Sequence, residues 1–121
     1  MQKSDLLVIY IYQLMSALRK GKSSTISETD VFTLLGMADK WQPSLSVKAL
    51  LAAFSGRSPE ALLLFALVLA QQALERDSEG LADKATRLLL AAVDEIPALQ
   101  SPALVDILQK LQALQRAPIS A

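Results

Sequence analysis

Few residues of this 121-residue chain could carry out chemistry. It contains no cysteine and no histidine, which removes thiolates, the commonest general base and the commonest transition-metal ligand. Asp94 and Glu95 are the only adjacent carboxylates. Consecutive helix positions point about 100° apart, so this pair does not readily share a proton or a metal. We expect either a solvated helix end or a contact with a lysine or arginine of a partner.

One short motif resembles part of a phosphate-binding loop. Gly21-Lys22-Ser23 matches the end of G-x-x-x-x-G-K-[ST], but Ser16 stands where the first glycine belongs. The preceding segment is also typical of a helix, whereas that loop follows a strand. We interpret Gly21 as the end of a helix and residues 21–27 as a polar linker. The sequence therefore predicts no enzyme, no metal and no cofactor, and an enzyme using carboxylate or lysine chemistry is the weakest alternative.

The composition indicates the elements that surround these residues. Hydrophobic residues make up 52% of the chain and aromatic residues only 5%, with four glycines and five prolines. Leucine and alanine, which favour helices, supply most of the apolar residues. We expect a single all-α domain over residues 1–121, with about six antiparallel helices. Its arrangement is either an irregular helical bundle or a set of helical hairpins.

Capping residues and breakers predict where these helices begin and end. Ser58-Pro59 and Ser101-Pro102 are strong helix starts, and Pro97 must follow a helix end. Residues 8–12 are β-branched or aromatic and would suit a strand, but the flanking caps and the length favour a helix. Residues 117–121 form a tail. The expected helices cover residues 5–20, 28–40, 44–54, 59–76, 81–95 and 102–116.

Two of these helices lack a proper polar side. The helix over 5–20 has a narrow polar strip made by Asp5, Gln13, Ser16 and Lys20, and the helix over 59–76 is apolar all round in its first ten residues. A helix without a polar face is buried on every side. Two such helices are hard to bury in one small monomer. We therefore expect one of them to meet another chain, in a homo-oligomer or a hetero-oligomer.

The charges allow a second interpretation. The net charge is zero, but residues 1–57 carry seven basic and four acidic side chains. Complementarity within or between chains is the simpler explanation. The alternative is a DNA-binding regulator that uses residues 19–57, with residues 31–54 as a helix-turn-helix. Its second helix is mostly leucine and alanine, whereas reading bases requires arginine, lysine, asparagine or glutamine.

A repeat-like pattern lies between Ala66 and Leu99. Small residues stand at 73, 85 and 92, Gly80 stands at the expected turn, and Pro97 ends the second helix. This segment resembles a single tetratricopeptide (TPR) repeat, a helix–turn–helix unit of 34 residues. It departs from the pattern at the usual aromatic positions, which hold Leu69, Arg76 and Ala82.

The resemblance implies a function in binding other proteins. TPR proteins hold a peptide or a partner's helix on the concave face of their first helices. By position, that face here is Leu67, Ala70, Gln71 and Leu74, and it suits an amphipathic helix. The resemblance implies that Leu67 and Leu74 are partly exposed in the free chain, while Leu89 packs inside the pair. Small helical chaperones of bacterial secretion systems are built on this scheme. We expect a chaperone, adaptor or regulator of another protein.

The apolar segments are too short to predict a membrane span. The longest uninterrupted run is Ala61–Ala70, about half of the roughly 20 residues that a spanning helix needs. Asp5 directly precedes the apolar residues 6–12, and no Ala-x-Ala pattern follows them. This does not predict a signal peptide, so we expect a cytoplasmic protein.

Overall fold

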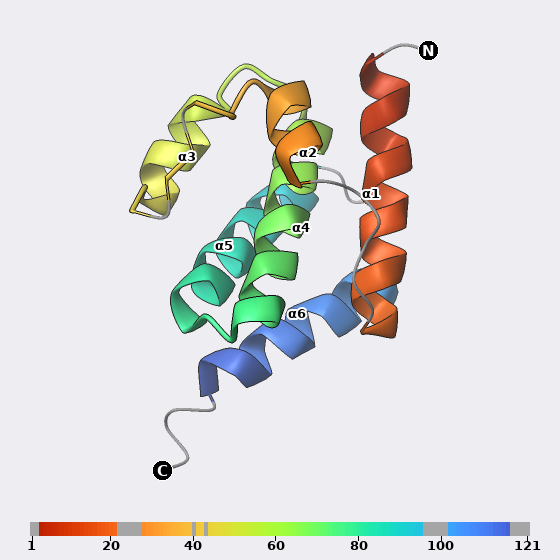
Figure 1. The fold of residues 1–121 in the computed structure, drawn as a ribbon, viewed down its shortest axis with the longest axis vertical. Coiled ribbons are helices and arrows are strands. Elements are labelled where there is room, and N and C mark those ends of the chain that lie inside the picture. The colour runs from red at the N-terminus through yellow and green to blue at the C-terminus, as the bar shows by residue number, and fades with distance from the viewer. Residues whose placement is uncertain (1–2, 22–27, 40, 43, 96–101, 117–121) are drawn as a thin grey trace.

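A computed structural model describes residues 3–21, 28–39, 41–42, 44–95 and 102–116 (Figure 1). Over these ranges the chain forms six α-helices and no strand, which confirms the predicted all-α class. The tail 117–121 and all of the expected linker except Gly21 lie outside the described residues. The helices are α1 (Lys3–Lys20), α2 (Glu28–Leu35), α3 (Val47–Ala53), α4 (Pro59–Arg76), α5 (Glu79–Glu95) and α6 (Pro102–Arg116).

Helix α4 is the centre of the molecule. It packs most extensively against α5, with which it forms a hairpin, and it also contacts α1, α2 and α6 (Figure 1). Every side chain from Ala61 to Ala73 is buried. The chain therefore covers the all-round apolar α4 by itself. Four other helices surround it, so α4 is the apolar helix that sits at the centre of the domain. The expectation that one of the two apolar helices meets another chain stays a prediction.

Aromatic side chains hold the two shortest helices on α4. The ring of Phe65 lies 5.7 Å from Phe32 of α2, 5.4 Å from Trp41 and 5.2 Å from Phe54. Tilted and edge-on pairs at these distances stabilise beyond the area they bury. Short helices have little stability of their own, so this cluster, centred on Phe65, fixes α2 and α3 in place.

Helix α1 packs through one stripe and is held at its C-terminal end. Its buried side chains recur at helical spacing, and α6 crosses its lower end (Figure 1). The Lys110 Nζ donates to the carbonyl oxygens of Leu18 at 2.7 Å and Arg19 at 2.9 Å. The Arg19 Nε also lies 3.2 Å from the Asp106 Oδ2. A lysine on the last carbonyls suits the negative end of a helix. The buried stripe consists of Leu7, Ile11, Leu14, Met15 and Leu18.

Helix α2 ends five residues earlier than predicted, at Leu35 instead of Lys40. Gly36 takes the left-handed conformation, with φ of 71°. The Met37 N–H then donates to the Phe32 carbonyl, and the Gly36 N–H donates to the Thr33 carbonyl. This pair of bonds is the Schellman motif, which satisfies carbonyls that the helix leaves open. A glycine inside an apolar run thus ends the helix.

The turn between α4 and α5 is made by a different residue from the one predicted. Gly80 lies in the first turn of α5, and Asp77 takes the left-handed conformation, with φ of 50°. The Ser78 Oγ accepts a bond from the Leu81 N–H, so Ser78 caps α5 and the helix begins at Glu79. The predicted start at Leu81 is therefore two residues late.

Helix α3 is shorter than the expected 44–54. The Ser46 Oγ accepts a bond from the Ala49 N–H at 3.1 Å, and the helix begins at Val47. Serine at 46 rather than at 44 is therefore the cap. None of the helices, over the described residues, is long and apolar enough to cross a membrane.

Candidate protein-binding surface

The four residues predicted to line a groove lie on α4, but they do not form an open face. Leu67 and Ala70 have no exposed surface, Gln71 is buried with its Nε2 3.3 Å from the Glu75 Oε1, and Leu74 is half-buried. The expectation that Leu67 is partly exposed is wrong, because neighbouring helices already cover α4. A partner's contact with these residues stays a prediction. It would first require α4 to lose part of this cover.

The predicted interior of the α4–α5 pair is confirmed. Leu89 has no exposed surface, as expected for the large residue inside the hairpin. Ala73, Ala85 and Ala92 are also fully buried. Small side chains let two helices approach closely, and α4 and α5 make the most extensive contact between helices in the fold. The TPR resemblance itself stays a prediction.

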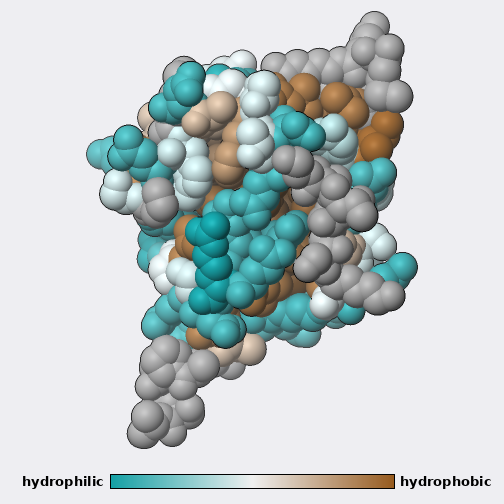
Figure 2. All heavy atoms as spheres, in the orientation of Figure 1, coloured by the Kyte–Doolittle hydropathy of each residue, from teal (hydrophilic) through white to brown (hydrophobic). Residues whose placement is uncertain are grey.

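An apolar surface does exist, on the outer side of α1. Val8, Ile9 and Tyr12 are 41%, 37% and 59% exposed. The three positions are neighbours on a helix, since residues four apart lie one turn above each other. Figure 2 shows hydrophobic side chains at the surface over the upper half of α1. We call these three residues the α1 surface patch. Their side chains point away from the stripe that packs on the rest of the chain.

The same side of α1 changes character toward its C-terminal end. Gln13, Ser16 and Lys20 are exposed, which confirms three of the four residues predicted to form its polar strip. The side chain of Asp5, the fourth, lies outside the described residues. Arg19 is also exposed and pairs with Asp106. The outer side of α1 is thus apolar at Val8, Ile9 and Tyr12 and polar to basic from Gln13 to Lys20.

The sequence signal for the α1 surface patch was present but incomplete. The narrow polar strip predicted that α1 has too much apolar surface for one packing stripe. The strand-like residues 8–12 are the part of α1 where the excess lies. The sequence could not show that apolar residues of α1, rather than of α4, would be exposed, because that depends on how the helices pack.

Of the loop and carboxylate motifs, the structure describes Gly21 and the carboxylates of α5. Gly21 has φ of 70°, and its N–H donates to the Leu18 carbonyl, as a helix-ending glycine does. Lys22 and Ser23 lie outside the described residues. No group of three carboxylates in the described part of the chain is placed to hold a metal ion. Asp83 and Arg87 form an ion pair one turn apart on α5, with 3.1 Å between Nε and Oδ2.

The alternative DNA-binding segment does not present an obvious reading helix. Helix α3 has seven residues, and Lys48 is its only charged one. Arg57 donates to the Leu35 carbonyl and lies 5.4 Å above the Phe54 ring. Arginines that already hold the fold are less available to phosphates. The DNA-binding hypothesis stays a prediction.

Comparison of the chain with protein-family models, with curated proteins and with solved structures found no match.

Proposed function

We propose that this chain is a non-enzymatic protein-binding module, a chaperone, adaptor or regulator, whose contact surface is the α1 surface patch. The observation that carries the proposal is the clustering of exposed apolar residues. Among the described residues, six large hydrophobic side chains are exposed, and three of them, Val8, Ile9 and Tyr12, share this patch. Single exposed apolar residues are ordinary, whereas a contiguous apolar patch is typical of an interaction surface.

The patch favours an amphipathic helix as its occupant. Tyr12, the most exposed of the three, offers a large apolar ring with a polar tip, and tyrosine is enriched in the cores of interfaces. Lys20 lies on the same side of α1, twelve residues after Val8, or about 18 Å along the helix axis. We therefore expect a partner helix with apolar residues opposite Tyr12 and a carboxylate near Lys20. Apolar anchors one turn apart are how helices bind to such surfaces.

Two double variants test the patch with equal changes in charge. Ile9→Lys with Tyr12→Lys places two cations in the patch. Gln109→Lys with Gln112→Lys places two cations at exposed positions of α6, outside this contact surface. Each tagged protein is used for affinity capture from its native cell, followed by mass spectrometry. We expect the patch variant to lose proteins that the wild type and the control variant both retain.

Circular dichroism of the two variants checks that both remain helical. If the patch variant and the control capture the same proteins as the wild type, the α1 surface patch is not the contact surface. Light scattering coupled to size exclusion then identifies the occupant. A homo-oligomer that the patch variant dissociates makes a second copy the occupant. A clean monomer at high micromolar concentration that captures nothing contradicts the proposed function.

A further inference from the structure

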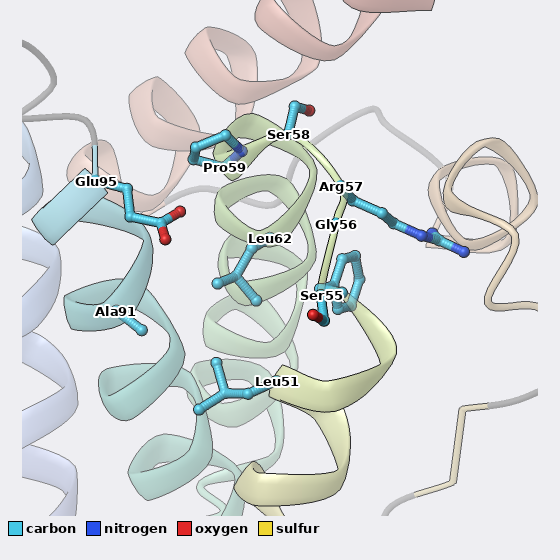
Figure 3. Close-up of a pocket in the computed structure, with 10 residues that line it drawn as sticks. Leu51, Ser55, Gly56, Arg57, Ser58, Pro59, Leu62, Ala91 and Glu95 are labelled. Carbon is cyan, nitrogen blue, oxygen red and sulfur yellow. The ribbon is translucent and has the colours of Figure 1, made fainter.

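A separate hollow of 310 Å³ lies where α3, α4 and α5 meet (Figure 3). Leu51 of α3, Leu62 of α4 and Ala91 of α5 turn toward one another and make its apolar wall. Binding sites for small ligands occupy about 300–1,000 Å³. The hollow is therefore at the small end of the range and suits one side chain better than a nucleotide or a large cofactor.

A single carboxylate faces this wall. The Glu95 side chain turns toward Pro59 and Leu62 in Figure 3. Glu95 forms no ion pair with any other residue that the structure describes. Arg57 also lines the hollow, but its guanidinium points away to the Leu35 carbonyl and the Phe54 ring. The nearby cation therefore does not neutralise Glu95.

The end of a helix adds to the negative charge. Glu95 is the last residue of α5, and the C-terminus of a helix carries a partial negative charge from its open carbonyls. A carboxylate there is slightly unfavourable unless a cation lies beside it. The hollow thus combines an apolar wall with a negative mouth. Lysine and arginine match both features, because their aliphatic stems pack on apolar surface while the charged head stays at the edge.

We propose that this hollow binds the side chain of a lysine or arginine from another protein. The stem packs against Leu51 and Leu62, and the cationic head meets the Glu95 carboxylate. The proposal rests on the proposed function only in that another protein supplies the cation. The hollow is built by α3, α4 and α5, whereas the patch lies on α1, so either site can fail while the other stands.

Small probes test the hollow without a partner protein. The full chain, labelled with ¹⁵N, is titrated with N-acetyl-lysine-N-methylamide and with N-acetyl-norleucine-N-methylamide, which lacks the ammonium. We expect saturable amide shifts at Leu51, Ser55 and Ala91, and about two- to fivefold weaker binding of the norleucine probe. This range is what an exposed ion pair contributes. Added salt should reduce the difference between the two probes.

A matched pair of variants tests whether the Glu95 carboxylate is the group that binds the ammonium. Glu95→Gln and Asp94→Asn each remove one carboxylate from neighbouring exposed positions of α5, and only Glu95 lines the hollow. Glu95→Gln should weaken binding of the lysine probe about two- to fivefold, so that the two probes bind with equal affinity. Asp94→Asn should leave the affinity for the lysine probe within twofold of that of the wild type.

Three results overturn the proposal: no saturable shifts around the hollow, equal binding of the two probes to the wild type, or equal weakening by both variants. These outcomes are independent of the capture experiment on α1. A chain that captures partners through α1 but binds neither probe retains the proposed function and loses this site. A chain that binds the lysine probe but captures nothing retains the site and loses the proposed function.

Discussion

Helices α1 and α4 both have eighteen residues and both lack a full polar side, yet they have opposite positions in the fold. Helix α4 is covered on all sides by its own chain from Ala61 to Ala73. Helix α1 buries one stripe and leaves Val8, Ile9 and Tyr12 exposed. The difference teaches that an apolar pattern around a helix predicts that its surface is buried, but does not identify which helix or protein buries it. The position of the helix among its neighbours decides whether the same chain or another protein does so.

The largest expected effect is the loss of stability when one carboxylate is placed in α4, compared with the same charge placed in α1. Leu67→Glu puts a carboxylate at a position of α4 with no exposed surface, which costs several kcal/mol without a counter-ion. That is comparable with the whole stability of a small domain. We expect the variant to be unfolded by circular dichroism. Tyr12→Glu on α1 should stay helical, and equal damage from both changes would remove the contrast between the helices.

The next effect measures the core that α4 shares with α5. Leu89→Ala removes a fully buried side chain and should lower the free energy of unfolding by about 2–5 kcal/mol, because it leaves a cavity. Urea unfolding measures the loss. Leu90→Ala, at the neighbouring exposed position of the same helix, is the control and should change stability by less than about 1 kcal/mol. Similar losses of stability in the two variants would mean that α5 does not pack on α4 through Leu89 as described.

A smaller effect concerns how α1 is held. Lys110→Met removes the ammonium that bonds the Leu18 and Arg19 carbonyls and should cost about 1–2 kcal/mol, since a bond to a charged group is lost. We expect hydrogen exchange to speed up in α1 and to stay slow in α4. Lys48→Met on α3 is the control. Equal acceleration in both helices would show that α1 opens only together with α4.

The smallest effect is the stability of the patch variant. Ile9→Lys with Tyr12→Lys should change the free energy of unfolding by about 1 kcal/mol or less, because each exposed substitution contributes within about 0.5 kcal/mol. Thermal melts beside the wild type measure it. A loss of several kcal/mol would show that these side chains serve the fold of the chain and not a contact with a partner.

Much of the fold could be predicted from the sequence because local signals mark most helix ends. Ser58-Pro59 and Pro102 begin helices where expected, and the α-helical class follows from composition. Local signals failed where two residues competed for one role. Gly36 ends α2 inside an apolar run that favoured continuation, and Asp77 rather than Gly80 takes the left-handed turn. Both residue types tolerate that conformation, so packing decides between them.

The candidate site was less predictable. The sequence identified the two helices that lack a polar side. The predicted groove, however, was placed on Leu67 and Ala70, which the chain buries. Burial of α4 depends on contacts between helices far apart in the sequence, and no local pattern reports them. Glu95 was singled out as a position for a partner's cation, but the apolar wall opposite it comes from three different helices. Only the fold brings Leu51, Leu62 and Ala91 together.

The aromatic residues give the two regions separate optical signals. Trp41 is the single tryptophan, and its ring meets Phe65 of α4 edge-on. Both tyrosines, Tyr10 and Tyr12, lie on α1. Tryptophan emission therefore reports the surroundings of α4, while tyrosine absorbance and the quenching of tyrosine emission report the surroundings of α1. Without any added label, spectroscopy can follow whether a partner that docks on α1 leaves the centre of the molecule undisturbed.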